Sequence, residues 1–275
     1  MDYINSITEA IGHTPLLKLN NIGKDLKANL FVKLEYLNPS GSYKDRMALA
    51  MIDAAQEGHT WNGRRLEKGG VVIEASAGNT APAVSMVCAA RGYDAHIYLY
   101  RYQMEDPKNT RLQITRSFGP EVKVSSEPHV YFTEEQIEEF SKKAPDLLHV
   151  LAAKKDCQLE EDSLGNAVWL DQIYNPYNYI GQEALGEEIF AQLDGHIDAV
   201  GCSTSSGASL YGMIRGLQHN GVRPEVIFGV EPEGSEKFFD FEGKEARYGE
   251  FQVSDAKTEI AEAVGLKKWV QEEAI

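Results

Sequence analysis

The chain has 275 residues, in which 27 Lys and Arg stand against 42 Asp and Glu, a formal net charge of −15 at pH 7. So acidic a balance argues against a protein that binds nucleic acid or anionic membrane, because both require basic surfaces. Hydrophobic residues make up 43% and charged residues 25%, as in ordinary globular proteins, which argues against global disorder.

Apolar, β-branched runs alternate with helical patterns along most of the chain. The runs predict strands at residues 30–35, 70–74, 96–100, 121–125, 197–202 and 226–230. The helical patterns predict helices at residues 43–56, 80–91, 106–118 and 208–218, and an amphipathic helix with a solvated acidic side at residues 133–140. The clearest signals are Thr80 at a helix cap, Pro82 in the first turn and Gly92 just past the end. This alternation predicts right-handed βαβ units and a mostly parallel sheet covered on both faces, which is an α/β fold.

Three loops after predicted strands are rich in Gly, Ser, Thr and Asn, and ligands bind to such loops in α/β sheets. In the first, residues 38–46, a Pro-Ser-Gly turn and a predicted N-cap at Ser42 place Lys44 in the first helical turn. The helix dipole and the neighbouring Arg46 disfavour a protonated amine there, which suits a nucleophilic lysine that forms a Schiff base. The alternative is a surface lysine paired with Asp45.

The other two loops are candidate anion sites. In residues 74–80, small side chains and Gly78 let backbone N–H groups converge at a helix start, a site of carboxylate size to which Asn79 adds a donor. In residues 201–209, backbone donors and hydroxyls at a helix N-terminus suit a phosphate dianion, although no Lys follows Gly207 as in a Walker loop. Alone, the loop at residues 74–80 would also fit an ordinary capped turn.

Together these loops resemble the fold-type-II pyridoxal-phosphate enzymes, specifically the cysteine synthase / cystathionine β-synthase family. The resemblance is carried, in family order, by residues 11–16, 38–46, 74–80, 172–176, 205–209 and 229–232. It implies a tryptophan-synthase-β-like fold of two three-layer α/β/α lobes with mostly parallel sheets. It also implies a smaller mobile lobe at residues 38–150, with the Schiff-base lysine and the carboxylate loop. Residues 1–37 plus 151–275 would form the larger lobe, with the phosphate loop.

The resemblance also implies roles for single residues. Lys44 would carry pyridoxal 5′-phosphate as an internal aldimine and move protons at Cα and Cβ of the substrate. Asn79 would hydrogen-bond the cofactor's ring oxygen. The substrate carboxylate would be held by Ser76, Ala77, Gly78, Asn79, Thr80 and Gln172. The cofactor phosphate would be held by Ser205, Ser206, Gly207, Ala208 and Ser209.

The activity implied is β-replacement or β-elimination on a serine-type amino acid through an aminoacrylate intermediate. The cysteine synthase form would join O-acetylserine or O-phosphoserine with sulfide to give cysteine, in a homodimer. Alternatives on the same fold are a cysteine desulfhydrase and a serine/threonine deaminase. The alternative from another class is a cofactor-poor pseudoenzyme that acts as a binding or regulatory partner.

The sequence departs from the family pattern in three places. Ala77 stands where the family has Ser, and the phosphate loop has Ser205, Ser206 and Ala208 where Gly, Thr and Gly are usual. After Pro232 we find no counterpart of the family's H-K-I-Q-G segment, of its S-S-G-A turn, or of the Ser or Thr that binds the pyridine nitrogen. These departures motivate the pseudoenzyme and predict a shortened C-terminal part. The retained Lys44, Asn79 and Gln172 favour an enzyme.

Cysteine and histidine usage bears on compartment and metals. Cys88, Cys157 and Cys202 are widely spaced without a C-x-x-C motif, which predicts neither a disulfide framework nor a zinc site. The seven histidines show no close i,i+4 pair, so no metal is expected. No apolar run reaches the roughly 18 residues of a membrane span, and Met1-Asp2-Tyr3 has no signal-peptide character. We therefore expect a cytoplasmic protein.

Overall fold

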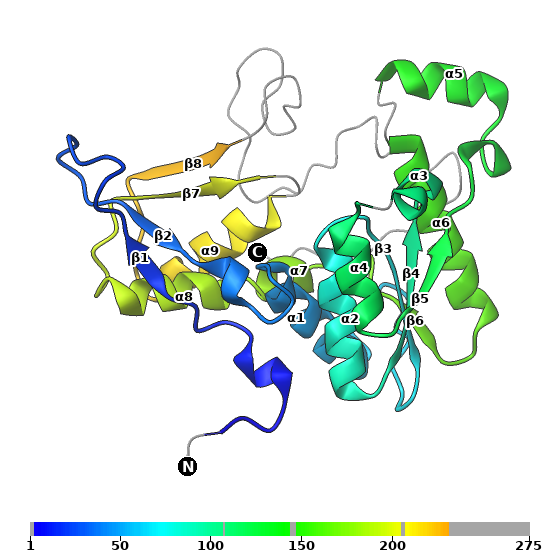
Figure 1. The fold of residues 1–275 in the computed structure, drawn as a ribbon, viewed down its shortest axis with the longest axis horizontal. Coiled ribbons are helices and arrows are strands. Elements are labelled where there is room, and N and C mark those ends of the chain that lie inside the picture. The colour runs from blue at the N-terminus through cyan, green and yellow to red at the C-terminus, as the bar shows by residue number, and fades with distance from the viewer. Residues whose placement is uncertain (1–2, 107, 144–146, 205–206, 231–275) are drawn as a thin grey trace. The chain divides into compact units, whose positions relative to one another are not determined.

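The computed structural model describes residues 3–106, 108–143, 147–204 and 207–230 (Figure 1). The chain divides into two compact units. The first is made of the described residues up to Met47 together with those from Tyr177 onward, and the second is Ala48–Pro176. The predicted α/β fold with mostly parallel sheets is confirmed. The lobe boundaries at residues 38 and 150, implied by the family resemblance, stay a prediction.

The second unit is built on a four-stranded parallel sheet in the order β5-β4-β3-β6. Its strands are β3 (Val71–Ala75), β4 (Asp94–Leu99), β5 (Glu121–Val124) and β6 (Ala167–Trp169). β3 pairs with both β4 and β6, so Val71 lies between Asp94 and Ala167. Val72 and Ile73 are fully buried, as expected for a central parallel strand covered on both faces. Because all four strands run the same way, the loops that follow β3 and β6 leave the sheet at the same edge.

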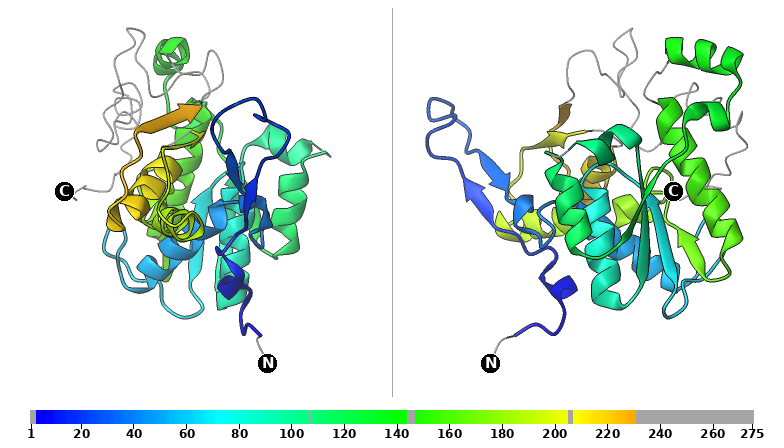
Figure 2. Two further views of the ribbon diagram at one scale, coloured as in Figure 1. Left: turned by 90° about the vertical axis from the view of Figure 1, so that its left-hand side faces the viewer. Right: turned by 45° about the vertical axis from the view of Figure 1, so that its right-hand side comes forward.

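Helices cover both faces of this sheet. α2 (Thr80–Arg91) and α4 (Thr110–Ser117) lie on one face and α6 (Leu147–Ser163) on the other (Figures 1 and 2). The acidic segment forms α5 (Glu134–Lys143), whose Phe140 is buried, as the amphipathic pattern predicts. The remaining short elements of this unit are α3 (Arg101–Glu105) and η3 (Pro128–Val130).

The predicted helix at residues 106–118 is wrong at its start. α3 ends at Glu105 and α4 begins only at Thr110, because the side chain of Asn109 accepts a hydrogen bond from the backbone N–H of Leu112 at 3.1 Å. This N-cap ends the preceding turn and starts a new helix. The N-cap predicted at Thr80 is also displaced, since Asn79 takes that position.

The first unit contains two small sheets. β1 (Leu16–Lys18) and β2 (Phe31–Lys33) are antiparallel, whereas β7 (Ala199–Ser203) and β8 (Val226–Val230) are parallel. The predicted strand at residues 30–35 is shorter than expected, because η2 (Glu35–Leu37) begins at its end. The helices are η1 (Ile7–Ala10), α7 (Tyr177–Ile180), α8 (Glu183–Gln192) and α9 (Ala208–His219), while α1 (Lys44–Gln56) begins in this unit and continues into the second.

α8 and α9 pack with their backbones in close contact. A Cβ atom at Gly216 would lie 1.9 Å from the carbonyl oxygen of Glu183, a distance that no side chain can adopt. The glycine therefore permits the helix contact. This packing holds α9 against α8.

Candidate functional site

Lys44 is the first residue of α1, as the loop pattern predicts. The Ser42 hydroxyl accepts a hydrogen bond from the Lys44 backbone N–H at 3.2 Å, which confirms Ser42 as a capping residue. Lys44 is half-buried, and its Nζ lies 4.9 Å from the centre of the Tyr43 ring. Asp45 is fully buried and accepts hydrogen bonds from the backbone N–H of Ser40, at 2.7 Å, and from its hydroxyl. Because Asp45 is buried, the alternative of Lys44 and Asp45 paired at the surface is wrong.

Arg46 anchors the start of α1 through two carboxylates. Its Nε lies 2.8 Å from Glu35 Oε2 and its Nη1 2.7 Å from Glu188 Oε1, while Lys33 Nζ lies 2.6 Å from Glu188 Oε2. Although burial by itself would raise it, the hydrogen bonds from Arg46 and Lys33 lower the pKa of Glu188 to about 2. The network fixes the backbone that carries Lys44.

Tyr43 connects the lysine to the start of α9. Its phenol lies near the side chain of Ser209, in the first turn of α9, and burial raises the pKa of Tyr43. The backbone carbonyl of Tyr43 accepts a hydrogen bond from Gln182 Nε2 at 3.1 Å. The first unit therefore brings the predicted Schiff-base lysine and the predicted phosphate loop together through one residue.

The residues of this unit fit pyridoxal phosphate, which needs an amine for its aldehyde and several donors for its phosphate dianion. Lys44 supplies the amine. The first turn of α9 supplies N–H groups that have no acceptor within the helix, together with the Ser209 hydroxyl. Gly207 precedes that turn with φ 79°, a left-handed conformation that glycine adopts without strain. Ala208 already has helical backbone, so the alanine replaces the family's glycine without strain.

Two predicted phosphate-binding residues, Ser205 and Ser206, lie outside the described residues, as do residues 231–275 with the predicted Glu231-Pro232 segment and the predicted shortened C-terminal part.

The predicted carboxylate loop lies in the second unit, between β3 and α2. Ser76 Oγ accepts a hydrogen bond from the Gly78 backbone N–H at 3.2 Å, which closes the loop. The structure brings Thr80 and Gln172 together, since the Thr80 hydroxyl donates to Gln172 Oε1 at 2.5 Å. The Asn79 side chain does not cap α2, and its Oδ1 accepts a hydrogen bond from Arg111 Nε at 3.0 Å. Arg111 belongs to none of the motifs, so no sequence signal pointed to it.

Buried charged residues support this loop from within the unit. Glu74 accepts hydrogen bonds from the backbone N–H groups of Ala75, at 2.8 Å, and Gln172, at 3.1 Å. Burial and the neighbouring Asp171 raise the pKa of Glu74 to about 8. Lys154 Nζ lies 2.5 Å from Asp171 Oδ1, and both side chains are buried. The sequence offered no signal for Lys154, which stands in a segment without a predicted element.

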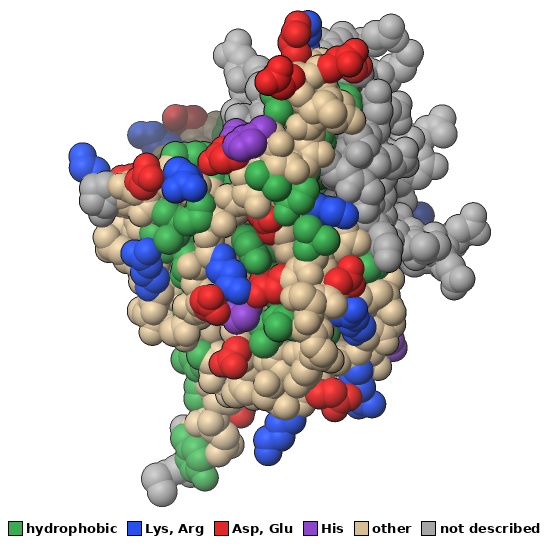
Figure 3. Space-filling model, turned by 90° about the vertical axis from the view of Figure 1, so that its right-hand side faces the viewer, with side chains coloured by type: hydrophobic (Ala, Val, Ile, Leu, Met, Phe, Trp, Pro, Cys, Tyr) green, Lys and Arg blue, Asp and Glu red, His purple; other side chains and the backbone are tan. Residues whose placement is uncertain are grey.

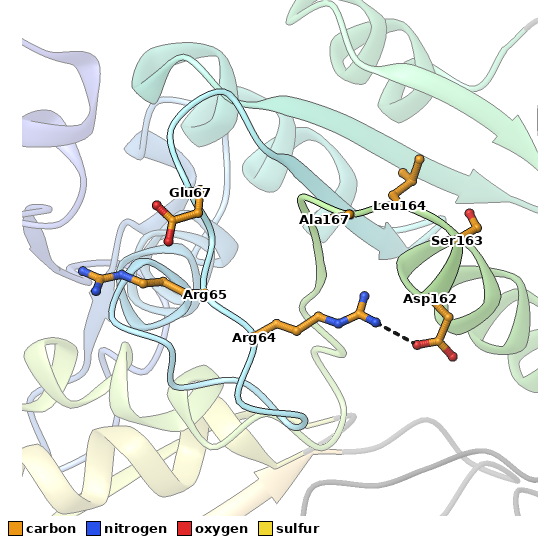
Figure 4. A pocket seen from close by; sticks show the side chains of 8 residues that line it. Arg64, Arg65, Glu67, Asp162, Ser163, Leu164 and Ala167 are labelled. Atoms are coloured by element: carbon orange, nitrogen blue, oxygen red, sulfur yellow. Dashed lines mark hydrogen bonds and ion pairs between the residues drawn. The ribbon is translucent and has the colours of Figure 1, made fainter.

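The described part of the second unit also has a pocket of about 430 Å³, far from these residues. It is lined by the segments from Arg64 to Glu67 and from Asp162 to Ala167, which precede β3 and β6 (Figure 4). Arg64 points toward Asp162, with Nη2 3.1 Å from Oδ1. The pocket therefore lies at the amino ends of the strands, whereas the carboxylate loop and Gln172 follow their carboxyl ends.

Among the described residues, the surface charges, the cysteines and the possible metal ligands add no residue to the candidate site. On the face drawn in Figure 3, acidic and basic side chains are interspersed over the described residues. The three cysteines carry free thiols, and burial raises the pKa of Cys202 to about 11. Within the described ranges no cluster of His, Cys, Asp or Glu is arranged to hold a metal ion. Nor does any helix described here have the length and apolar character to cross a membrane.

The chain is similar to several known proteins. Residues 7–275 match the family described as pyridoxal-phosphate dependent enzyme. The chain is 34% identical over 234 residues to cysteine synthase 1 of Emericella nidulans, covering 85% of this chain and 56% of that protein. It is 32% identical over 232 residues to cysteine synthase B of Salmonella typhimurium, covering 84% of this chain and 66% of that protein. The chain thus spans less than two thirds of the length of either relative.

A solved structure with a similar fold is that of a hydrogen sulfide-producing enzyme from Fusobacterium nucleatum. It superposes with a TM-score of 0.68 and 27% sequence identity, over 86% of this chain and 68% of that one.

Proposed function

Since the chain belongs to the pyridoxal-phosphate dependent enzymes, we propose that it catalyses a β-replacement that joins O-acetylserine or O-phosphoserine with sulfide to give cysteine. The observation that carries the proposal is the fixed position of Lys44 at the start of α1, joined through Tyr43 to the first turn of α9. A nucleophilic amine and a phosphate-sized donor set thus occur together in one unit. The bound cofactor supplies an electron sink for the α-carbon of the substrate.

The protein's own residues bind the substrate and move its protons. The Lys44 amine would hold the cofactor, and as a general base it would take the proton from the substrate Cα and later return it to Cα. The Asn79 amide would donate to the ring oxygen of the cofactor. The substrate carboxylate is bound by the Gln172 amide and by backbone N–H groups of the loop before Thr80. A small amino acid is the substrate that the family resemblance implies.

The cysteine synthases of Emericella and Salmonella support sulfide addition as the main outcome. The Fusobacterium protein, described as a hydrogen sulfide-producing enzyme, favours a second candidate, release of sulfide from cysteine by β-elimination. Both reactions use the same residues and differ in whether sulfide enters or leaves. We also propose, as sequence and family resemblance predict, a homodimer in the cytoplasm.

The visible absorption spectrum of the purified chain with pyridoxal phosphate tests the proposal. Wild type and the exposed-site control Lys24→Ala should show a band that borohydride bleaches, and Lys44→Ala should lack it. Cysteine formation from O-acetylserine or O-phosphoserine with sulfide, compared with sulfide release from cysteine, then separates the two candidates. If wild type shows no band at saturating cofactor, the enzyme is excluded and the pseudoenzyme takes its place.

A further inference from the structure

Lys154 and Asp171 form a buried ion pair, and a contribution to the stability of the fold does not account for it. The two side chains are only 4% and 2% exposed, and their charged atoms lie 2.5 Å apart. Lys154 Nζ also lies 4.1 Å from the centre of the Tyr174 ring. A buried ion pair adds little stability compared with apolar residues of the same size, because both charges lose their hydration. The location of the ion pair therefore points to a role in positioning the neighbouring segment of the chain.

Asp171 shapes the turn that carries Gln172. Its backbone has φ 48°, a left-handed conformation in which Asp and Asn are tolerated better than most residues. Its backbone carbonyl accepts hydrogen bonds from the N–H groups of Tyr174, at 3.1 Å, and Asn175, at 2.9 Å, while its carboxylate faces Lys154. Lys154 holds this carboxylate from α6, so the turn depends on the ion pair.

The turn decides how the Gln172 side chain is presented. The Gln172 backbone N–H donates to Glu74 Oε2 at 3.1 Å, which ties the turn to β3. The side-chain oxygen of Gln172 accepts the Thr80 hydroxyl at 2.5 Å. With its oxygen toward Thr80, the amide directs its two N–H donors away from Thr80. A carboxylate accepts from such donors, whereas a neutral amide group accepts more weakly.

The charges around Lys154 match this role. Asp171 pairs with it directly, and the carboxyl of Glu74 lies near both. Burial and the neighbouring Asp171 raise the pKa of Glu74, which favours its neutral form beside the ion pair.

We propose that Lys154 and Asp171 are positioning residues for the substrate carboxylate, because their ion pair fixes the turn from which Gln172 presents its amide N–H groups. This inference rests on the proposed function. It predicts that the pair determines the preference for a free carboxylate without touching substrate.

Binding of L-serine and L-serinamide to the cofactor-loaded protein, followed through the visible band, tests the inference. Wild type and Lys155→Met, a control one residue along α6, should prefer L-serine. In Lys154→Met and Asp171→Asn the preference for L-serine over L-serinamide should fall about 10- to 100-fold, because a small displacement of a binding group has effects of this size. Their bands with cofactor alone should match wild type, KM should rise and kcat should change little.

Lys154→Arg separates positioning from a general loss of structure, since it keeps the charge and should restore most of the preference. If Lys154→Met does not fold, Asp171→Asn decides, because Asn tolerates the left-handed backbone and leaves the carbonyl that closes the turn unchanged. The inference is overturned if the folded variants prefer L-serine as wild type does. The proposed function fails separately, if wild type binds L-serine but neither forms cysteine nor releases sulfide.

Discussion

The two units bury carboxylates in opposite electrostatic settings. In the first, Glu35 and Glu188 face two cations, Arg46 and Lys33, at 2.6 to 2.8 Å. In the second, Glu74 and Asp171 share the single cation Lys154. Burial raises the pKa of the glutamates in both places, but hydrogen bonds from the cations bring the pKa of Glu188 down to about 2, whereas that of Glu74 rises to about 8.

The difference shows that burial alone does not set the protonation of a glutamate. The ratio of cations to carboxylates within hydrogen-bond reach decides the direction of the pKa shift. The first network is fully charged and anchors α1, on which Lys44 stands. In the second the raised pKa of Glu74 favours its neutral form, and the network supports the loop that would bind a carboxylate, where a surplus negative charge would repel the substrate.

The largest expected effect comes from breaking the first network. Arg46→Met removes the cation that pairs with both Glu35 and Glu188 and leaves two largely buried carboxylates short of partners. We expect a loss of about 3–5 kcal/mol in the free energy of unfolding, measured by urea denaturation. Arg223→Met, at an exposed site of the same unit, should lie within about 0.5 kcal/mol of wild type. If both substitutions lowered the free energy of unfolding equally, the role of the buried network in stability would be contradicted.

The second network should appear in the pH dependence of stability. Because the pKa of Glu74 is raised from 4.5 to about 8, the folded state keeps a proton that the unfolded state releases between these values. Stability is therefore lost as pH rises from about 4.5 to 8, by at most about 1.4 kcal/mol per pH unit from this group. Glu188 acts at the other end, since its stabilisation is lost as pH falls from 4.5 toward 2.

Glu74→Gln removes the titrating group and should flatten the slope between pH 5 and 8 by up to about 1 kcal/mol per unit. The variant should also be less stable at pH 5 by about 1–3 kcal/mol, because its amide nitrogen faces a backbone N–H donor. Urea unfolding at pH 5, 6, 7 and 8 measures both, with Glu67→Gln at an exposed site as control. An unchanged slope in Glu74→Gln would show that Glu74 is ionised in the folded protein.

The smallest effect is expected where charges pair in solvent. Lys142 Nζ lies 2.9 Å from Glu138 Oε1 on α5, a separation like those in the buried networks, but the side chains are 70% and 77% exposed. Lys142→Met should change stability by at most about 0.5 kcal/mol, because water and salt screen the pair. A loss of stability comparable to that of Arg46→Met would mean that the distance between the charges, and not their burial, determines how much each ion pair contributes to stability.

Local sequence pattern was sufficient for the elements whose signals lie within the element. α2 and β8 have the predicted bounds, and α1 and α9 begin within one residue of them, since apolar period, small loop residues and terminal glycines act over a few residues. The same loops led to Lys44 and Asn79 as candidates, whereas Gln172 came from the family resemblance alone. The helix predicted at residues 106–118 started too early because the Asn109 cap outweighs the helical pattern before it.

Tertiary structure alone decided the contacts that orient those candidates. Arg111 meets Asn79 across 32 positions of sequence, and Lys154 meets Asp171 only because α6 packs against the sheet that ends before Asp171. The opposite pKa shifts of Glu74 and Glu188 also follow from burial and from partners distant in the chain. A sequence names the residue types, but the number of cations that reach a buried carboxylate is set when the strands and helices pack.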